Sequence, residues 1–236
     1  MKINSKEYWN DRFSSGDWTA KGGENQTFQF SQSQARFLVQ LPNCRTLLDF
    51  GCGTGEAFQT YRSVFPDAKL FGVDHAPAAI DIARAKFSTI ADFSTSVNEH
   101  RPQFDYVICS NVLEHVEDPD AMARDLLRYA SQAVIIVTPY KEKPFDSEHV
   151  NRFSDSSFAD LNPSQVHVFK SPGWTEYGRS LVYHVYFLNI LRFLTGKPTR
   201  RRRMQVMYIL PSHEGQGQII RDRERDSFSH SRRLLS

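Results

Sequence analysis

Between Arg45 and Thr138, short strand-like runs alternate with stretches of helical character, and no other feature of the sequence constrains the fold as strongly. The runs predicted to be strands are 46–50, 69–74, 88–91, 104–109 and 133–137, with helices over 56–65, 76–87 and 119–130. Most of these strands are apolar throughout, as expected for strands that are covered on both faces. The pattern therefore predicts a doubly wound α/β sheet whose parallel strands are linked by helices.

The regular alternation of predicted strands and helices ends after Pro139. We expect a short helix over 154–161, a strand over 165–170, a long helix over 176–194 and a last strand over 204–210. Residues 2–40 are expected to be helical, with a loop over 16–23. A length of 236 residues fits one domain. The expected organisation is a helical lead-in or lid over 1–40, a single domain over 41–210 and a disordered basic tail over 211–236.

Composition excludes several classes of protein. The chain has three cysteines, Cys44, Cys52 and Cys109, whose spacing argues against a disulfide-bonded secreted module and a cysteine-based zinc site. The sequence has neither a run of about 18 apolar residues nor an N-terminal signal peptide. We therefore expect a soluble cytoplasmic protein.

The net charge of +2 conceals an asymmetry. Residues 197–236 hold ten of the 29 Lys and Arg residues and four of the 27 Asp and Glu residues, so the rest of the chain is mildly acidic. A domain that follows nucleic-acid phosphates would carry positive charge on its folded body. We interpret the basic tail as a solvated terminus, with a nucleic-acid arm as the alternative, and do not expect nucleic acid as a partner.

A helix over 181–194 would be apolar nearly all round, and the basic run 200–203 follows it closely. Such a helix is buried in a core, lies at a subunit interface or contacts lipid. An apolar helix beside a basic cluster can also dock on an anionic membrane. Core packing or a homodimer contact is the simpler interpretation, and peripheral membrane contact through 181–203 is the alternative.

A glycine-rich turn, Gly51-Cys52-Gly53-Thr54-Gly55, follows the first predicted strand and precedes a helix. Small residues there let a ligand approach the backbone, and the free amides of the helix start face that ligand. The spacing is GxGxG, with Glu56 where the third glycine of a dinucleotide-binding turn would stand. Carboxylates at Asp49 and Glu56 suit a ligand that carries an amine better than a pyrophosphate.

Two further acids are predicted at strand ends. Asp74 closes the second strand, where a carboxylate can accept hydrogen bonds from both ribose hydroxyls. Asp92 is expected to end the third strand and to accept from an exocyclic amine, with Phe93 stacking on the base. An Asp at a strand end is also a common turn or cap residue. Together with the glycine turn, these acids predict a pocket for an adenosine joined to an amino acid.

These residues resemble the motifs of the class I S-adenosylmethionine-dependent methyltransferases. Residues 47–55 (LLDFGCGTG) are similar to the family's first motif, Gly72-Val73-Asp74 to its second, and 104–116 to the fourth-strand motif of its small-molecule branch. The resemblance covers about 45–160. It implies a Rossmann-like sheet of seven strands, mostly parallel, with the last strand antiparallel, and S-adenosylmethionine as the cofactor.

The resemblance also implies roles for individual residues. Asp49, Gly51, Cys52, Gly53 and Gly55 would hold the methionine part. The remaining cofactor contacts would be Asp74 at the ribose, Asp92 and Phe93 at the adenine, Asn111 beside the sulfonium, and His75.

Methyl transfer to a hydroxyl benefits from a base, and two histidines follow strand ends. His149 and His115 are the candidate catalytic residues, although either could be structural. Arg152 could bind an anionic substrate or pair with Glu148, and Tyr140 is a second candidate substrate contact. The Asp-Asp-Asn pattern of the metal-dependent catechol enzymes is absent, so no metal is expected.

An aromatic and polar segment over 8–27 would close over the cofactor as a lid or pack as a helix on the sheet edge. The expected activity is O-methylation of a small-molecule or glycan acceptor, which could be carrier-linked. The alternatives are N-methylation of a small molecule, RNA methylation that uses the arginine run, and a cofactor-binding scaffold without catalysis.

Overall fold

The computed structural model of the protein describes residues 1–97, 104–143, 145–171, 187, 190–196 and 204–212. Most of the predicted apolar helix, the arginine run and nearly all of the tail lie outside these residues. Their predicted contacts with a membrane, a second subunit or nucleic acid therefore stay predictions. Within the described part of the chain, no helix has both the length and the apolar character needed to cross a bilayer.

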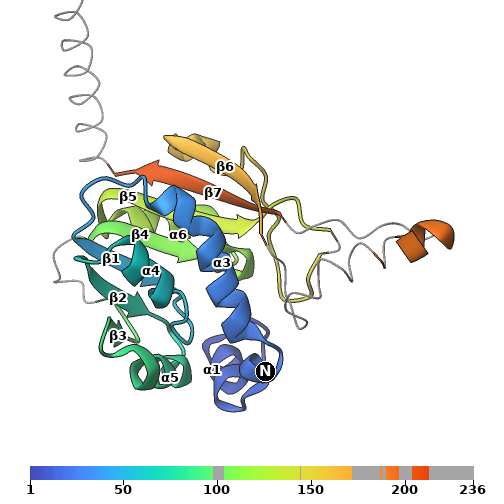
Figure 1. Ribbon diagram of the computed structural model, residues 1–236, viewed down its shortest axis with the longest axis horizontal. Coiled ribbons are helices and arrows are strands. Elements are labelled where there is room, and N and C mark those ends of the chain that lie inside the picture. The colour runs from blue at the N-terminus through green and yellow to red at the C-terminus, as the bar shows by residue number, and fades with distance from the viewer. Residues whose placement is uncertain (98–103, 144, 172–186, 188–189, 197–203, 213–236) are drawn as a thin grey trace, which may run out of the picture.

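One seven-stranded sheet organises the molecule, with strand order β3-β2-β1-β4-β5-β7-β6 (Figure 1). The strands are β1 (Thr46–Phe50), β2 (Lys69–Val73), β3 (Asp92–Ser94), β4 (Phe104–Ser110), β5 (Ala130–Pro139), β6 (Gln165–Lys170) and β7 (Met204–Pro211). Strands β1 to β5 pair in parallel, and β7 lies antiparallel between β5 and β6. The predicted Rossmann-like α/β fold with an antiparallel last strand is confirmed.

Helices cover both faces of this sheet because alternate strand residues point to opposite sides. The helices are α1 (Lys6–Ser14), α2 (Asp17–Ala20), α3 (Gly23–Leu38), α4 (Phe58–Val64), α5 (Pro77–Phe87) and α6 (Pro119–Leu127). Leu47 of β1 packs in one core with residues of α3, α4 and α5, whereas the next residue, Leu48, packs in a second core with residues of α6. The two cores make this a doubly wound sheet.

Two predicted elements were wrong. Residues 88–91 are not a strand, because the backbone amides of Ile90 and Ala91 bond back to the carbonyl of Phe87 at the end of α5. Strand β3 therefore begins at Asp92 instead of ending there. The predicted helix over 154–161 is a series of turns with one 3₁₀ turn, Ala159–Leu161.

The N-terminal segment packs in two places. Helix α3 joins the core on the face of α4, whereas α1 lies beside α5 at the edge of the molecule (Figure 1). The side-chain oxygen of Asn10 accepts from the backbone amide of Ala78 at 3.0 Å, and Phe13 packs on Ala76 and Ala79. The loop predicted over 16–23 contains the short helix α2.

Candidate active site

A cavity of about 760 Å³ lies at the carboxyl ends of the parallel strands. Its walls come from the turn after β1, the ends of β2 and β4, the residues after β3, the loop after β5 and helices α1 to α3. Ligand sites in doubly wound sheets lie at this edge. The volume falls within the range of small-molecule and cofactor sites.

The glycine turn forms one wall, through Gly51, Cys52 and Gly53. Gly51 has φ +78°, and a Cβ there would lie 2.3 Å from the Cγ2 of Val112. This position therefore needs glycine both for its backbone conformation and for the close approach of Val112 in the loop after β4.

Gly55 and the residue after the turn, Glu56, do not line the cavity, although both were predicted from the sequence to lie next to the ligand. Gly55 faces α5, where a Cβ would lie 3.2 Å from the Cβ of Ala83, so its small size allows helix packing. Glu56 accepts from the hydroxyl of Thr54 at 2.5 Å and from Lys86 at 3.0 Å. Its carboxylate is therefore satisfied within the protein.

Substituting Gly51 by Ala is expected to destabilise the protein more than substituting Gly16 by Ala. Gly16 has nearly the same φ, +79°, but a Cβ there would meet nothing within 4 Å. Each change should cost about 1–2 kcal/mol of backbone strain, and only Gly51→Ala adds a clash. Thermal unfolding of both variants measures the difference, and equal melting temperatures would show that the clash is relieved without cost.

Asp49 and Asp74 lie side by side on the cavity wall. The carboxylate of Asp74 accepts from the backbone amides of Gly53 at 3.0 Å and Ala76 at 2.9 Å. Burial raises the pKa of Asp74, and these two hydrogen bonds oppose the rise. Burial also raises the pKa of Asp49 to about 7, the charge of Asp74 adds to it, and a hydrogen bond from Tyr61 opposes it. A cationic group bound between them would relieve this repulsion.

The placement of Asp92 and Phe93 at the adenine needs correction. Asp92 lies outside the cavity, on an exposed surface beside Arg84 and Ser88. Phe93 is a core residue whose ring packs on that of Phe58, with centroids 4.9 Å apart. Because β3 starts later than predicted, its carboxyl end brings 95–97 to the cavity instead.

A chain of amides at the end of β4 surrounds Asn111, which lines the cavity with φ +56°. Its side-chain oxygen accepts from Gln205 of β7 at 2.9 Å, and its side-chain NH₂ donates to Ser110 at 3.0 Å. Ser110 also accepts from Gln34 of α3 at 2.9 Å. Gln34 and Gln205 were not predicted from the sequence. Each lines the cavity with a buried Oε1 that has no hydrogen-bond partner among the described residues.

His115 and His149 meet in the cavity with their rings T-shaped and centroids 4.9 Å apart. The Nδ1 of His115 lies 3.1 Å from the carbonyl oxygen of Glu148, which makes Nδ1 the donor. The Nδ1 of His149 lies 2.6 Å from the carboxylate of Glu142. In both rings the first nitrogen is thus engaged, which leaves Nε2 as the group available to a ligand.

The surroundings lower the pKa of His115 and raise the pKa of His149. Burial lowers the pKa of His115 to about 4, and the charge of His149 lowers it further. Burial also lowers the pKa of His149, but the hydrogen bond to Glu142 and the charge of Glu114 outweigh burial and raise it. Burial raises the pKa of the Glu114 carboxyl to about 7, against the charge of His149.

Of the two predicted substrate contacts, Tyr140 lines the cavity and Arg152 does not. Tyr140 lines the cavity and its hydroxyl lies 3.3 Å from Asp155. Arg152 lies outside the cavity, with its exposed guanidinium 4.6 Å from the ring centroid of Phe145. The partner of Glu148 is Arg12 of α1, which was not predicted.

Helix α1 covers the histidine end of the cavity. Trp9 packs on His115 with ring centroids 5.0 Å apart. The carboxylate of Glu148 pairs with Arg12 and accepts from the hydroxyl of Tyr8 at 2.6 Å. The lead-in segment therefore forms part of the cavity wall instead of a separate unit.

Part of the chain matches a known family of proteins. Residues 48–133 match the family model described as a methyltransferase domain. The chain is 33% identical over 88 residues to the trans-aconitate 2-methyltransferase of Methylobacterium radiotolerans. That alignment covers 36% of this chain and 32% of the relative, so the chain matches about a third of that protein's length.

Solved structures resemble the chain over most of its length. The plantazolicin methyltransferase BpumL in complex with SAH aligns with a TM-score of 0.56 and 16% identity, over 89% of this chain and 96% of BpumL. The complex of the Haloferax volcanii Trm112 activator with a methyltransferase aligns with a TM-score of 0.60 and 16% identity, over 86% of this chain and 98% of the matched chain. At these identities the likeness concerns the fold.

Proposed function

We propose that the protein transfers a methyl group from S-adenosylmethionine to an acceptor oxygen, because residues 48–133 match a methyltransferase domain and the sheet has the strand order of the class I methyltransferase fold. The acceptor is a small molecule or a glycan, which can be carrier-linked. The observation that carries the proposal is one cavity that joins the glycine turn and Asp74 to the two histidines.

The cofactor would occupy the half of the cavity over β1 and β2. The backbone of Gly51–Gly53 would face the methionine part, and the ammonium group would lie near Asp49, where a positive charge offsets two neighbouring carboxylates. Asp74 would accept from the ribose hydroxyls, with His75 at the rim of the cavity. Residues 95–97 replace Asp92 and Phe93 as the candidates for contact with the adenine.

The acceptor would enter at the histidine end of the cavity, with Tyr140 as a further contact. Transfer breaks the sulfur–methyl bond and forms the oxygen–methyl bond in line, so the acceptor oxygen must face the sulfonium. In the simplest form of the proposal, the Nε2 of His149 accepts the hydroxyl proton and Glu142 stabilises the imidazolium. A neutral amine attacks without losing a proton first, so a paired imidazole and carboxylate favour oxygen as the acceptor atom.

Matched acceptors test the choice of atom. The protein is incubated with methyl-labelled S-adenosylmethionine and with pairs that differ only in hydroxyl or amine, such as phenol with aniline and a hexose with its hexosamine. Label on the hydroxyl members alone is the expected result. Label on the amine of any pair would contradict oxygen as the acceptor atom.

The affinity for S-adenosylhomocysteine is expected to rise as the pH increases from about 5.5 to 7.5. Asp49, with a pKa of about 7 in the free protein, is partly protonated below that pH and must ionise to face the ammonium group. The raised pKa of Asp49 thus weakens binding of the ligand at pH values below about 7 and has no effect at higher pH. Calorimetry across this range measures the trend, and Asp49→Asn should bind more weakly with a flat profile. A wild-type profile equally flat would place the ammonium elsewhere.

A further inference from the structure

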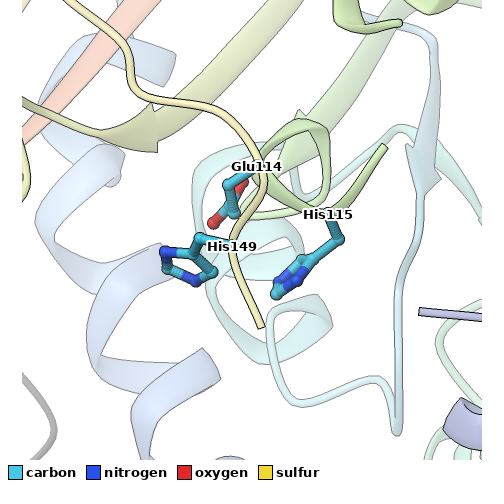
Figure 2. A group of neighbouring side chains, drawn as sticks. All are labelled: Glu114, His115 and His149. Carbon is cyan, nitrogen blue, oxygen red and sulfur yellow. The ribbon is translucent and has the colours of Figure 1, made fainter. Parts of the chain in front are cut away.

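A buried carboxylate with one unpartnered oxygen stands beside the two histidines. Glu114 is 1% exposed and its Oε2 has no hydrogen-bond partner among the described residues. A buried ionisable oxygen is costly unless something pairs with it. Glu114 and His115 come from the 3₁₀ turn Leu113–His115 after β4, and His149 comes from the loop after β5 (Figure 2).

The three side chains offer one ligand atom each within a small volume. These atoms all lie within 4.8 Å of one another. Two atoms that each lie about 2.0–2.2 Å from one ion can be no more than about 4.4 Å apart, so small side-chain movements would bring all three into contact with an ion. Figure 2 shows the three side chains gathered in one place.

Each histidine ring has one nitrogen hydrogen-bonded to a protein oxygen, as is usual for metal-binding histidines. Ligating imidazoles commonly donate their other nitrogen to a carboxylate or a backbone carbonyl, which fixes the ring and its tautomer. His149 uses Nδ1 on Glu142 and His115 uses Nδ1 on the carbonyl of Glu148. Glu142 and the His149 side chain are themselves mostly buried, so this pair is part of the built structure rather than a surface contact.

The surroundings favour a cation over a neutral ligand. Besides Glu114, the carboxylates of Glu142, Asp146 and Glu148 line this end of the cavity, and Arg12 pairs with Glu148. Two exposed lysines, Lys141 and Lys143, also line the cavity, and Lys141 pairs with Asp155. A divalent ion would offset the remaining negative charge. Two imidazoles with one carboxylate suit a first-row transition ion better than Mg²⁺ or Ca²⁺, which prefer oxygen ligands.

We propose that Glu114, His115 and His149 bind a divalent first-row transition-metal ion at the acceptor end of the cavity. Three protein ligands leave coordination positions open to the acceptor oxygen. This role rests on the proposed function. The bound hydroxyl would release its proton to water, and the resulting oxyanion would attack the methyl group, so the oxygen–methyl bond forms as the sulfur–methyl bond breaks. With the ion bound, His149 acts as a ligand and not as the base.

Metal titration of the untagged full-length protein tests the site directly. After removal of metal with a chelator, Zn²⁺ binding is followed by calorimetry and Co²⁺ binding by its visible absorption, with Mg²⁺ as a comparison. We expect one equivalent of Zn²⁺ or Co²⁺ and visible Co²⁺ bands of low coordination number. Glu142→Gln should weaken binding by about 10–100-fold, and Glu114→Gln, His115→Asn and His149→Asn should weaken it further.

His167→Asn is the matched control, because His167 lies on β6 outside the cavity and stacks on Phe37. It should bind metal as the wild type does. Absence of a one-equivalent site, or equal binding by the ligand variants and the control, would overturn the proposal. Circular dichroism shows whether each variant is folded, and Glu142→Gln gives an answer even if a ligand variant is not.

The cofactor is tested separately. S-adenosylhomocysteine should bind with the chelator present and to Glu114→Gln, because the cofactor half of the cavity does not include these ligands. Metal binding without cofactor binding would remove the proposed function and leave the metal site. Cofactor binding without metal binding would remove the metal site and leave His149 as the base.

Discussion

Replacing Arg12 by Met is expected to lower the free energy of unfolding by about 3 kcal/mol, equivalent to a fall in Tm of about 6–12 °C. The Arg12 guanidinium is almost fully buried, pairs with Glu148 and lies over the rings of Trp9 and Trp18 at 5.5 and 5.7 Å. Met keeps much of the side-chain volume but leaves the Glu148 carboxylate with Tyr8 as its remaining side-chain donor among the described residues. The expected loss of about 3 kcal/mol is at the lower end of the range for breaking a buried ion pair. The reason is that the Glu148 side chain is 22% exposed.

Lys2→Met is the matched control. Lys2 pairs with Glu117 at 2.7 Å, but both side chains are largely exposed, at 78% and 82%. Exposed pairs contribute little to stability, so the Tm should not change measurably. If Arg12→Met melts at the same temperature as Lys2→Met, the contact between α1 and the loop after β5 does not stabilise the folded protein.

Replacing Asp74 by Asn is expected to weaken S-adenosylhomocysteine binding by about 100-fold. The proposed contacts are two hydrogen bonds from ribose hydroxyls to a carboxylate, each contributing about 1.5 kcal/mol, and about 1.4 kcal/mol corresponds to a tenfold change in Kd. Asn keeps the shape of Asp74 but has one acceptor oxygen, so only one of the amides of Gly53 and Ala76, which donate to different oxygens of Asp74, keeps its side-chain acceptor. Calorimetry measures the Kd, and circular dichroism checks the fold.

Asp92→Asn is the control for this change. Both acids stand at the strand positions that the sequence marked as cofactor contacts, but only Asp74 lines the cavity. The Kd for Asp92→Asn should equal that of the wild type. A loss of affinity at Asp92 with none at Asp74 would mean that the ligand occupies the outer edge of β3.

The placement of the glycine turn and Asp74 on one cavity wall could be predicted because the information for it is local. The turn Gly51–Gly53 and the acid Asp74 each follow a strand directly, and parallel neighbouring strands bring their carboxyl ends together. The same reasoning went wrong one strand further out. There, the turn that follows α5 runs to Ala91 and shifts β3 along the chain, so Asp92 begins this strand and lies outside the cavity.

The acceptor half depends on contacts between segments that are distant in the sequence. Arg12 and Glu148 are 136 positions apart, and Gln34 and Ser110 are 76 apart. No periodicity or spacing links such pairs before the chain is folded. His115 and His149 were identified as separate candidates for a base. Glu114 was not identified, because its burial and its unpartnered Oε2 follow from packing.

The expectation that no metal is bound rested on the absence of one all-oxygen ligand pattern from the sequence. The ligand group proposed above, Glu114, His115 and His149, forms only when the loop after β5 returns to the turn after β4. The backbone amide of Val150 donates to the carbonyl of Glu114 at 2.7 Å and fixes this return. Because His149 is far from Glu114 and His115 in the sequence, the sequence alone does not indicate that the three side chains meet.

A crystal structure of the protein with S-adenosylhomocysteine tests the central claim most directly. The account predicts both ribose hydroxyls within about 2.5–3.2 Å of the Asp74 carboxylate, the amino-acid part over Gly51–Gly53, and the sulfur facing His115 and His149. A ligand bound outside this cavity, or one whose ribose avoids Asp74 and whose sulfur points away from the histidines, would contradict it.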